Sequence, residues 1–289
     1  MGAKTTLILG GGLGGLTAAA HLRRLTSAEH RIVVVEKKET FSLCMANLWL
    51  MTGDRQTPEE GEREMSKLAT KGIDWVRGEV HALDPVARTV RTSAGTLDAD
   101  YLVVALGAER KPQALPGFAE AALNLYEAAG AQEIRSALAG FEGGRIVVLI
   151  SRTPFSCPAA PYEAAFLIDD VLRKRGVRER AEIAVYTPEN LPMPVAGPVI
   201  GAALVSMLEE RGIEFRGEHI AMKVDHASRK VLFEIDETSY GLLIGVPPHA
   251  APQAARDSNL VDASGWIPVD QGTLETRHPG VFAIGDATA

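Results

Sequence analysis

Near its start the chain carries the sequence TTLILGGGLGG, which runs from Thr5 to Gly15. Thr5 to Leu9 is a short apolar run typical of a buried parallel strand, and apolar residues then recur at helical spacing through about Leu25. Arg31 to Val35 is a second apolar, β-branched run. A strand, a glycine-rich turn, a helix and a strand in this order predict the opening unit of a doubly wound α/β sheet.

The motif Gly10-x-Gly12-x-x-Gly15 has a mechanical meaning at this place. One glycine makes a tight turn, the next lets the backbone approach a pyrophosphate, and the third lets helix and strand pack closely. Glu36 ends the next strand, where a carboxylate can accept hydrogen bonds from ribose hydroxyls. The sequence therefore predicts a dinucleotide site, and a glycine-rich turn without a ligand is the alternative.

The far end of the chain favours FAD over NAD as this dinucleotide. Gly285-Asp286 follows an apolar run, and an aspartate at such a turn can bind the ribityl hydroxyls of a flavin. We predict cofactor contacts from both ends of the chain and from the strand that ends near Ala105. The predicted cofactor-binding residues are Gly10, Gly12, Leu13, Gly14, Gly15, Glu36, Lys37, Cys44, Val80, Ala105, Gly107, Gly285 and Asp286.

The second half of the chain repeats this plan with a different turn. Arg145 to Ile150 reads as a buried strand, and apolar spacing predicts helices over Pro161 to Arg175 and Gly197 to Arg211. The turn after the strand reads SRTPFSCP, from Ser151 to Pro158, and is poorly suited to cradle a pyrophosphate. This turn can instead present the thiol of Cys157.

We predict an α/β fold of two Rossmann-like, three-layer dinucleotide-binding domains, in which the second interrupts the first. Residues 1–111 and 248–289 would bind FAD, and residues 112–247 would carry the redox cysteine. We also expect a helix around Glu62 to Lys71 and a small antiparallel meander over Trp75 to Leu97.

Composition excludes several classes of protein. A chain of 289 residues has room for about two domains, and a net charge of −7 argues against a nucleic-acid partner. The sequence has no metal-ligand spacing and no serine-histidine-acid signature, so no metal site is expected. The short polar stretch before the first strand leaves no room for a signal peptide, which predicts a cytoplasmic protein with peripheral contact at the inner membrane still open.

Cys157 is the leading candidate for a reactive group. It lies just before the helix predicted at Pro161, and because helix N-termini stabilise anions, we expect a depressed pKa and a nucleophilic thiol. A buried, inert cysteine is the alternative. Glu163 could carry a proton to or from sulfur, or could simply be a favourable charge in the first turn. His249 could face the flavin, and a structural role is equally open.

Cys44 lies in the long connection after Glu36. It could pair with Cys157, bond covalently to the flavin, or merely be packed.

Taken together, these residues resemble the flavoproteins with two dinucleotide-binding domains, and in particular sulfide:quinone oxidoreductases and the flavoprotein subunit of flavocytochrome c sulfide dehydrogenase. The resemblance covers essentially the whole chain. The Gly10–Gly15 loop and the ending Val281–Asp286 are general features of the superfamily. The turn Cys157-Pro158-x-x-Pro161-Tyr162-Glu163 and the stretch Ile244–His249 are more specific to the sulfide branch.

The resemblance implies a mechanism. Cys157 would be one member of a redox cysteine pair, sulfide would attack the oxidised pair to leave a persulfide, and a thiolate would add to the flavin. FAD would pass two electrons to a quinone or a cytochrome. In the flavocytochrome subunits a cysteine at about the position of Cys44 carries the flavin. Members of the family continue well beyond the Gly-Asp turn, so this chain resembles a form that lacks the C-terminal domain with its partner cysteine and its membrane contact.

The sequence thus predicts an FAD-dependent oxidoreductase that oxidises sulfide or a related sulfur species through a cysteine. A type II NADH dehydrogenase or ferredoxin-reductase-like enzyme is one alternative, but it needs a glycine loop after Ile150 that the sequence lacks. A truncated flavin-binding protein without turnover is another.

Overall fold

The computed structural model describes residues 2–288, which divide by their internal contacts into two compact units. Within these residues, the first unit comprises residues 2–42, 62–109 and 250–288, and the second comprises Leu43–Gly61 and Arg110–His249. The predicted domain limits, 1–111 with 248–289 and 112–247, stay a prediction. The compact units differ from them chiefly in residues 43–61, which belong to the second unit.

The first unit is built on a five-stranded parallel sheet in the order β20-β9-β1-β2-β5. Its strands are β1 (Thr5–Leu9), β2 (Arg31–Glu36), β5 (Asp74–Arg77), β9 (Tyr101–Val104) and β20 (Val281–Ala283). Leu7 lies between Val33 and Leu102 in register. The predicted doubly wound arrangement at the start of the chain is therefore present.

Alternate residues of these strands face two different layers. Ile8, Ile32 and Val34 pack with Ala19 of α1 (Leu13–Leu25). On the other face, strand residues such as Leu7 pack with α7 and with a meander of antiparallel strands. These elements are α7 (Gln253–Asp257), β6 (Val80–Asp84), β7 (Thr89–Thr92) and β8 (Gly95–Asp98).

Two local predictions for this unit were wrong. The meander begins at Val80 rather than Trp75, because Trp75 lies in β5, pairs in parallel with buried β2, and donates a hydrogen bond from Nε1 to the Glu36 carbonyl over 3.2 Å. The helix expected at Glu62 is a 3₁₀ helix over Met65–Lys71 that ends at Gly72 in the left-handed region. It follows a short two-stranded ribbon of β3 (Thr40–Phe41) and β4 (Arg63–Glu64).

The second unit is built on another five-stranded parallel sheet, in the order β11-β18-β12-β13-β14. Its strands are β11 (Leu123–Asn124), β12 (Gly144–Ile150), β13 (Ala181–Tyr186), β14 (Ile213–Arg216) and β18 (Leu242–Val246). The run predicted from Arg145 to Ile150 is the central strand, and its last five residues are buried.

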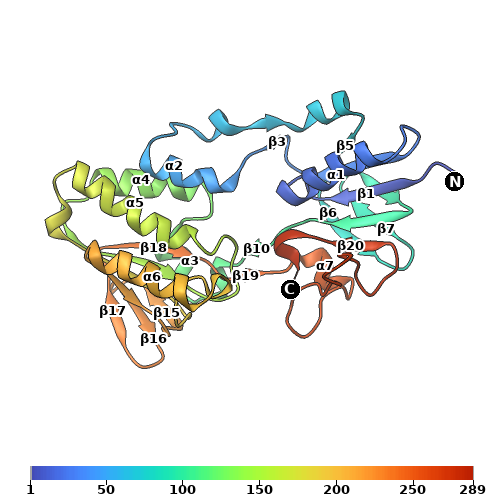
Figure 1. The fold of residues 1–289 in the computed structure, drawn as a ribbon. Helices are drawn as coiled ribbons and strands as arrows, with labels where there is room; N and C mark the ends of the chain where they lie inside the picture. The colour runs from blue at the N-terminus through green and yellow to red at the C-terminus, as the bar shows by residue number, and fades with distance from the viewer. Residues whose placement is uncertain (1, 289) are drawn as a thin grey trace. The chain divides into compact units, whose positions relative to one another are not determined.

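Helices cover one face of this sheet and a small antiparallel sheet covers the other (Figure 1). Val148 and Ile183 face the helical layer, whereas Val147 and Ala184 face the opposite one. The helices are α2 (Asn47–Thr52), α4 (Ala128–Ala139), α5 (Ala160–Lys174) and α6 (Pro198–Glu210). The opposite layer holds α3 (Phe118–Ala121), β15 (Ala221–Asp225), β16 (Lys230–Phe233) and β17 (Glu237–Ser239), and the remaining strands of the chain are β10 (Glu109–Arg110) and β19 (His249–Ala250).

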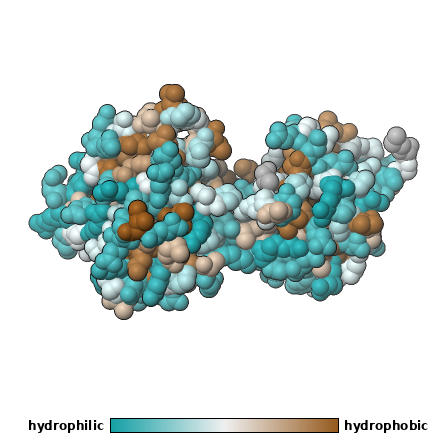
Figure 2. All heavy atoms as spheres, turned by 90° about the horizontal axis from the view of Figure 1, so that it is seen from below, coloured by the Kyte–Doolittle hydropathy of each residue, from teal (hydrophilic) through white to brown (hydrophobic). Residues whose placement is uncertain are grey.

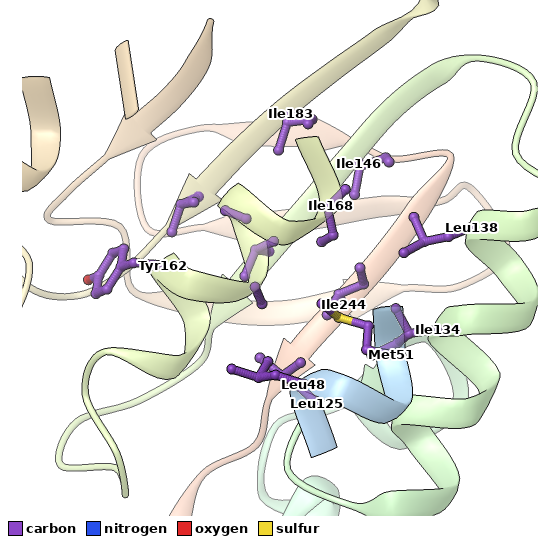
Figure 3. Close-up of a cluster of buried hydrophobic side chains, with 14 of the residues drawn as sticks. Leu48, Met51, Leu125, Ile134, Leu138, Ile146, Tyr162, Ile168, Ile183 and Ile244 are labelled. Atoms are coloured by element: carbon purple, nitrogen blue, oxygen red, sulfur yellow. The ribbon is translucent and has the colours of Figure 1, made fainter. Parts of the chain in front are cut away.

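The helix predicted from Pro161 is confirmed as α5, whose residues Ala164, Ile168 and Leu172 are fully buried at helical spacing. The helix predicted from Gly197 is confirmed as α6. Figure 3 shows how α2 adds to this core, with Met51 beside Ile134 and Ile244. The sequence did not predict α2 or α4.

None of the helices formed by residues 2–288 has the length and apolar character that crossing a bilayer requires. On the face drawn in Figure 2, hydrophilic residues predominate and hydrophobic residues gather in separate patches.

We expect Ile168→Ala to lower the free energy of unfolding by about 2–5 kcal/mol, because the side chain is fully buried between α5 and the sheet. The matched change Ile235→Ala, at a side chain that is 92% exposed, should cost less than about 0.5 kcal/mol. Denaturant unfolding of both variants measures the difference, and equal losses would contradict this account of the core.

Candidate active site

The glycine turn after β1 tolerates no side chains at two positions. A Cβ on Gly10, whose φ is +106°, would lie 2.3 Å from the Ala105 carbonyl oxygen. A Cβ on Gly15 would lie 2.0 Å from the Gly10 carbonyl oxygen. Gly12 is different, since its Cβ position has open space around it. Close packing below the turn and open space above it are what a diphosphate needs.

The helix that follows the turn begins without a side-chain cap, because its N-cap residue is Gly12. The first N–H groups of a helix have no partner within the helix and carry its positive dipole. At α1 these groups are available to an anion, so the turn fits the pyrophosphate of a dinucleotide.

Glu36 is held beside this turn by two backbone groups. Its Oε2 accepts a hydrogen bond from the Gly11 N–H over 2.7 Å, and its Oε1 accepts one from the Lys38 N–H over 2.9 Å. A carboxylate has about four lone-pair sites, so both oxygens retain capacity for ribose hydroxyls. The position therefore fits the role that the sequence predicts.

Gly285 and Asp286 come directly after Ile284, which lies against the start of α1. Ile284 Cδ1 is 3.4 Å from the Cβ position of Gly14, which places the end of β20 next to the start of α1. Gly285 has a φ of +74°, and the Asp286 side chain is exposed. Residues from the two ends of the chain thus meet at one edge of the sheet, as expected for the carboxyl ends of parallel strands.

The other residues predicted to bind the cofactor differ from one another in exposure and in the contacts that they make. Leu13, the first residue of α1, is largely exposed, and Gly107 follows β9 with a φ of +70°. Val80 packs against the core from β6. Lys37 pairs with Glu79, with 2.8 Å between Nζ and Oε1. The roles of all these residues in binding FAD stay predictions.

Cys157 lies in the second unit, in the turn between β12 and α5. Its φ is +48°, in the left-handed region that non-glycine residues rarely adopt, and its side chain is half-buried. The Tyr126 hydroxyl donates to the carbonyl oxygens of Ser156 (2.6 Å) and Cys157 (3.1 Å). The Cys157 carbonyl also accepts from the Ala160 N–H, which joins the turn to the start of α5. Sequence reasoning missed Tyr126.

Cys44 belongs to the same unit as Cys157. It begins a 3₁₀ helix, Cys44–Ala46, that runs directly into α2, and its side chain is exposed. The two cysteines line one cavity of about 30 Å³. The other residues that line it are Met45, Asn47, Leu48, Leu125, Tyr126 and Ala160.

Two further predicted residues lie nearby in the chain. Glu163 is in the first turn of α5 with an exposed side chain, and it is not among the residues that line this cavity. His249 packs edge-on against Tyr126, with ring centroids 5.5 Å apart. A role for Glu163 in proton transfer stays a prediction.

A larger pocket, of about 590 Å³, opens beside the same turn and was not predicted. Burial raises the pKa of the Glu189 carboxyl above its ordinary value of 4.5, and hydrogen bonds from Tyr162 Oη (2.7 Å) and Thr187 offset this only in part. The pocket is lined by Thr153, Pro154, Phe155, Pro158, Glu189, Asn190, Leu191, Pro194, Val195, Gly197 and Pro198. Glu189 comes three residues after β13 and Glu36 is the last residue of β2, so an acid near the end of the second strand of each unit could have identified Glu189.

The turn itself differs chemically from the glycine turn of the first unit. Pro154 and Pro158 have no N–H to offer a phosphate. Arg152 is tied to the backbone, since its Nη1 donates to the carbonyl oxygens of Ser151 and Ala221, each over 2.6 Å. The cradle for a second dinucleotide is therefore poor.

Comparisons with known proteins agree with this picture. The sequence pattern of the family described as pyridine nucleotide-disulphide oxidoreductase matches residues 4–289. The chain is 30% identical over 308 residues to the mitochondrial sulfide:quinone oxidoreductase of Mus musculus, covering 98% of this chain and 65% of that protein. It is also 25% identical to a type II NADH:quinone oxidoreductase of Staphylococcus aureus, covering 99% of this chain and 75% of that protein.

The fold has close parallels among solved structures. The sulfide:quinone oxidoreductase of Aquifex aeolicus superposes with a TM-score of 0.88 at 23% identity, over 99% of this chain and 69% of that one. The predicted α/β fold, the predicted resemblance and the predicted class of FAD-dependent oxidoreductase are confirmed. The chain spans 65% of the length of the mouse protein.

We expect Gly15→Ala to weaken FAD binding by about tenfold or more, because its new methyl group would push the Gly10 carbonyl out of the turn. Gly140→Ala is a matched control, since the nearest atom to its Cβ position is 3.9 Å away. Fluorescence titration of the apoprotein with FAD measures both affinities. An unchanged affinity in Gly15→Ala would show that the turn does not hold the cofactor.

We expect Glu189→Gln to raise the melting temperature near pH 7. The folded-state pKa of Glu189 is raised, so ionisation of this carboxyl costs stability above its ordinary pKa of 4.5, and this cost is absent below it. The advantage of the variant should therefore shrink as the pH falls toward 4.5. Thermal unfolding across this pH range tests the sign, with the exposed Glu210→Gln as control.

Proposed function

The chain belongs to the pyridine nucleotide-disulphide oxidoreductase family, and on that premise we propose that it oxidises sulfide through Cys157 and delivers the electrons to a quinone. FAD, when bound, supplies an acceptor for two electrons that can pass them on to a second substrate. The residues of the first unit bind and orient it: the α1 N-terminus holds the diphosphate, Glu36 the ribose and Asp286 the ribityl chain.

The observation that carries this proposal is the turn that presents Cys157. A non-glycine residue at positive φ costs about 1–3 kcal/mol, and such strain persists where the surroundings impose it, often at functional sites. Here the Tyr126 hydroxyl is within hydrogen-bond distance of the carbonyl oxygens of Ser156 and Cys157, which supports the conformation of the turn. The turn lies where a nicotinamide-binding domain would bind the pyrophosphate of its coenzyme. In this proposal, the same position presents a reactive thiol in place of a phosphate site.

The electron acceptor is proposed from the relatives. The proteins from mouse and Aquifex aeolicus are named for sulfide and quinone, and we extend both substrates to this chain. A cytochrome is the second candidate for the acceptor. Peripheral attachment to a membrane would bring the flavin within reach of a quinone dissolved there.

NADH is the competing electron donor, and the similarity to type II NADH:quinone oxidoreductases favours it. Two features of the second unit oppose it: the prolines of the turn remove N–H donors, and Arg152 is engaged with backbone carbonyls. A flavin-binding protein without turnover is the third reading, and it predicts that neither donor reduces the flavin.

We expect sulfide to bleach the flavin absorbance of the anaerobic protein, and NADH to leave it unchanged. Cys157→Ser should slow the sulfide reaction by about 100-fold or more, because serine cannot form a persulfide. Ser156→Ala in the same turn keeps both thiols and the backbone carbonyls that Tyr126 contacts, and should react like the parent protein.

Stopped-flow spectra of the parent and both variants separate the readings. If NADH bleaches the flavin and sulfide does not, the protein is an NADH dehydrogenase and this proposal is wrong. Sulfide bleaching of Cys157→Ser at the parent rate would remove Cys157 from the mechanism.

A further inference from the structure

We infer that the pocket of about 590 Å³ beside Glu189 is a binding site for a small organic cation, an ammonium or guanidinium group joined to an apolar body. The inference goes beyond the proposed function and does not rest on it. The residues that line this pocket all belong to the second unit, and neither Cys44 nor Cys157 is among them.

The first support is the size and lining of the pocket. Its volume of about 590 Å³ falls within the range of about 300–1,000 Å³ that is typical of small-molecule sites. Glu189 supplies the one charge among the described residues of the wall, with Asn190 and Thr153 as neutral polar neighbours. The apolar side chains of the wall are Pro154, Phe155, Pro158, Leu191, Pro194, Val195 and Pro198.

The second support is that the loop after β13, which forms one wall, is packed in place from two sides. A Cβ on Gly201 of α6 would lie 2.9 Å from the Pro192 carbonyl oxygen. A Cβ on Gly217, just after β14, would lie 2.7 Å from the Asn190 carbonyl oxygen. Backbone approaches this close leave the loop little freedom, so the pocket is formed before any ligand enters it.

The third support is a carboxylate without a counter-ion. Glu189 is half-buried, and its Oε2 accepts hydrogen bonds from Tyr162 Oη over 2.7 Å and from Thr187 Oγ1 over 3.4 Å. In Figure 3 the oxygen of Tyr162 is directed away from the other labelled side chains of the core. Both donors are neutral, and within residues 2–288 Glu189 forms no ion pair. A partly buried charge of this kind is stabilised by a cation that binds beside it.

The start of α6 also reaches the pocket, and a helix N-terminus favours an anion. Its effect is limited here, because Pro198 has no N–H and the Gly197 N–H donates to the Pro194 carbonyl over 3.1 Å. A helix dipole corresponds to about half a charge, whereas ionised Glu189 carries a full one.

The sign of the ligand charge follows from the same wall. None of its described residues is Lys, Arg or His, so a phosphate or carboxylate would meet Glu189 without a cationic partner. A neutral diol would leave the charge of Glu189 uncompensated. The ring of Phe155, which also lines the pocket, attracts cations to its face. A cation therefore gains from two groups of the wall.

Three probes with the same phenyl ring and two-carbon chain test the charge selection. At neutral pH phenethylamine is a cation, phenethyl alcohol is neutral and hydrocinnamate is an anion. Each is titrated into the holoprotein, and changes in the NMR spectrum give the dissociation constant. We expect the amine to bind at least about tenfold more tightly than the alcohol, and hydrocinnamate to bind most weakly.

Two variants with matched controls identify the carboxylate. Glu189→Gln keeps the shape of the side chain and should bring the amine and the alcohol within about twofold of each other, whereas the exposed Glu210→Gln should keep the preference. Asn190→Lys places an ammonium beside Glu189 and should weaken amine binding by about tenfold or more. Gln271→Lys makes the same change of charge at an exposed position of the first unit and should have no effect.

Four results would overturn the cation site: no binding of the amine, equal affinity of the parent protein for amine and alcohol, tighter binding of hydrocinnamate, or a preference that survives in Glu189→Gln. Tighter binding of adenosine than of the amine would also overturn it, and would assign the pocket to a nucleoside. None of these measurements depends on reduction of the flavin, so the cation site and the proposed function can fail separately.

Discussion

The burial of Leu48, Leu50 and Met51 fixes α2, and with it the segment that begins at Cys44, in the core of the second unit. These three side chains carry the connection after β2 away from the sheet that it leaves and into the core of the second unit. Removing apolar surface from water contributes about 1.5–3 kcal/mol for each such side chain, so a six-residue helix is held firmly in place. That packing also determines the position of Cys44, because Cys44 begins the 3₁₀ helix that leads into α2.

The two parallel sheets are built alike, but the turns at their carboxyl edges differ in the groups that they offer to a ligand. At the carboxyl edge of the first, glycines allow backbone to touch backbone, and the N–H groups of α1 remain available to an anion. At the carboxyl edge of the second, two prolines and a strained cysteine occupy the equivalent turn. A parallel sheet places the ends of its strands together in both cases, so a few residues in one turn are enough to change which groups that edge of the sheet offers to a ligand.

Much of the fold could be predicted because its signals are local. Apolar runs identified the central strands of both sheets, and the spacing of Ala164, Ile168 and Leu172 identified α5. The sequence did not predict α4, because Gly130 lies in its first turn and weakens the local preference for helix. That glycine has a tertiary reason, since a Cβ there would lie 2.0 Å from the Asn124 carbonyl oxygen. Trp75 was misplaced for a similar reason, because its strand is selected by pairing with β2.

The amino-acid sequence alone determined the glycine turn, the acid at the end of β2 and a thiol ahead of α5, because each depends on neighbours within a few residues. It also predicted FAD as the cofactor, which the comparisons support, from Gly285-Asp286 near the other end, whose contacts with FAD stay a prediction. Only the tertiary structure decided that Cys44 shares a cavity with Cys157, that Tyr126 secures the cysteine turn, and that Glu189 lines a pocket. Those relations join residues far apart along the chain, and they arise from the packing of whole helices and strands, which no local pattern records.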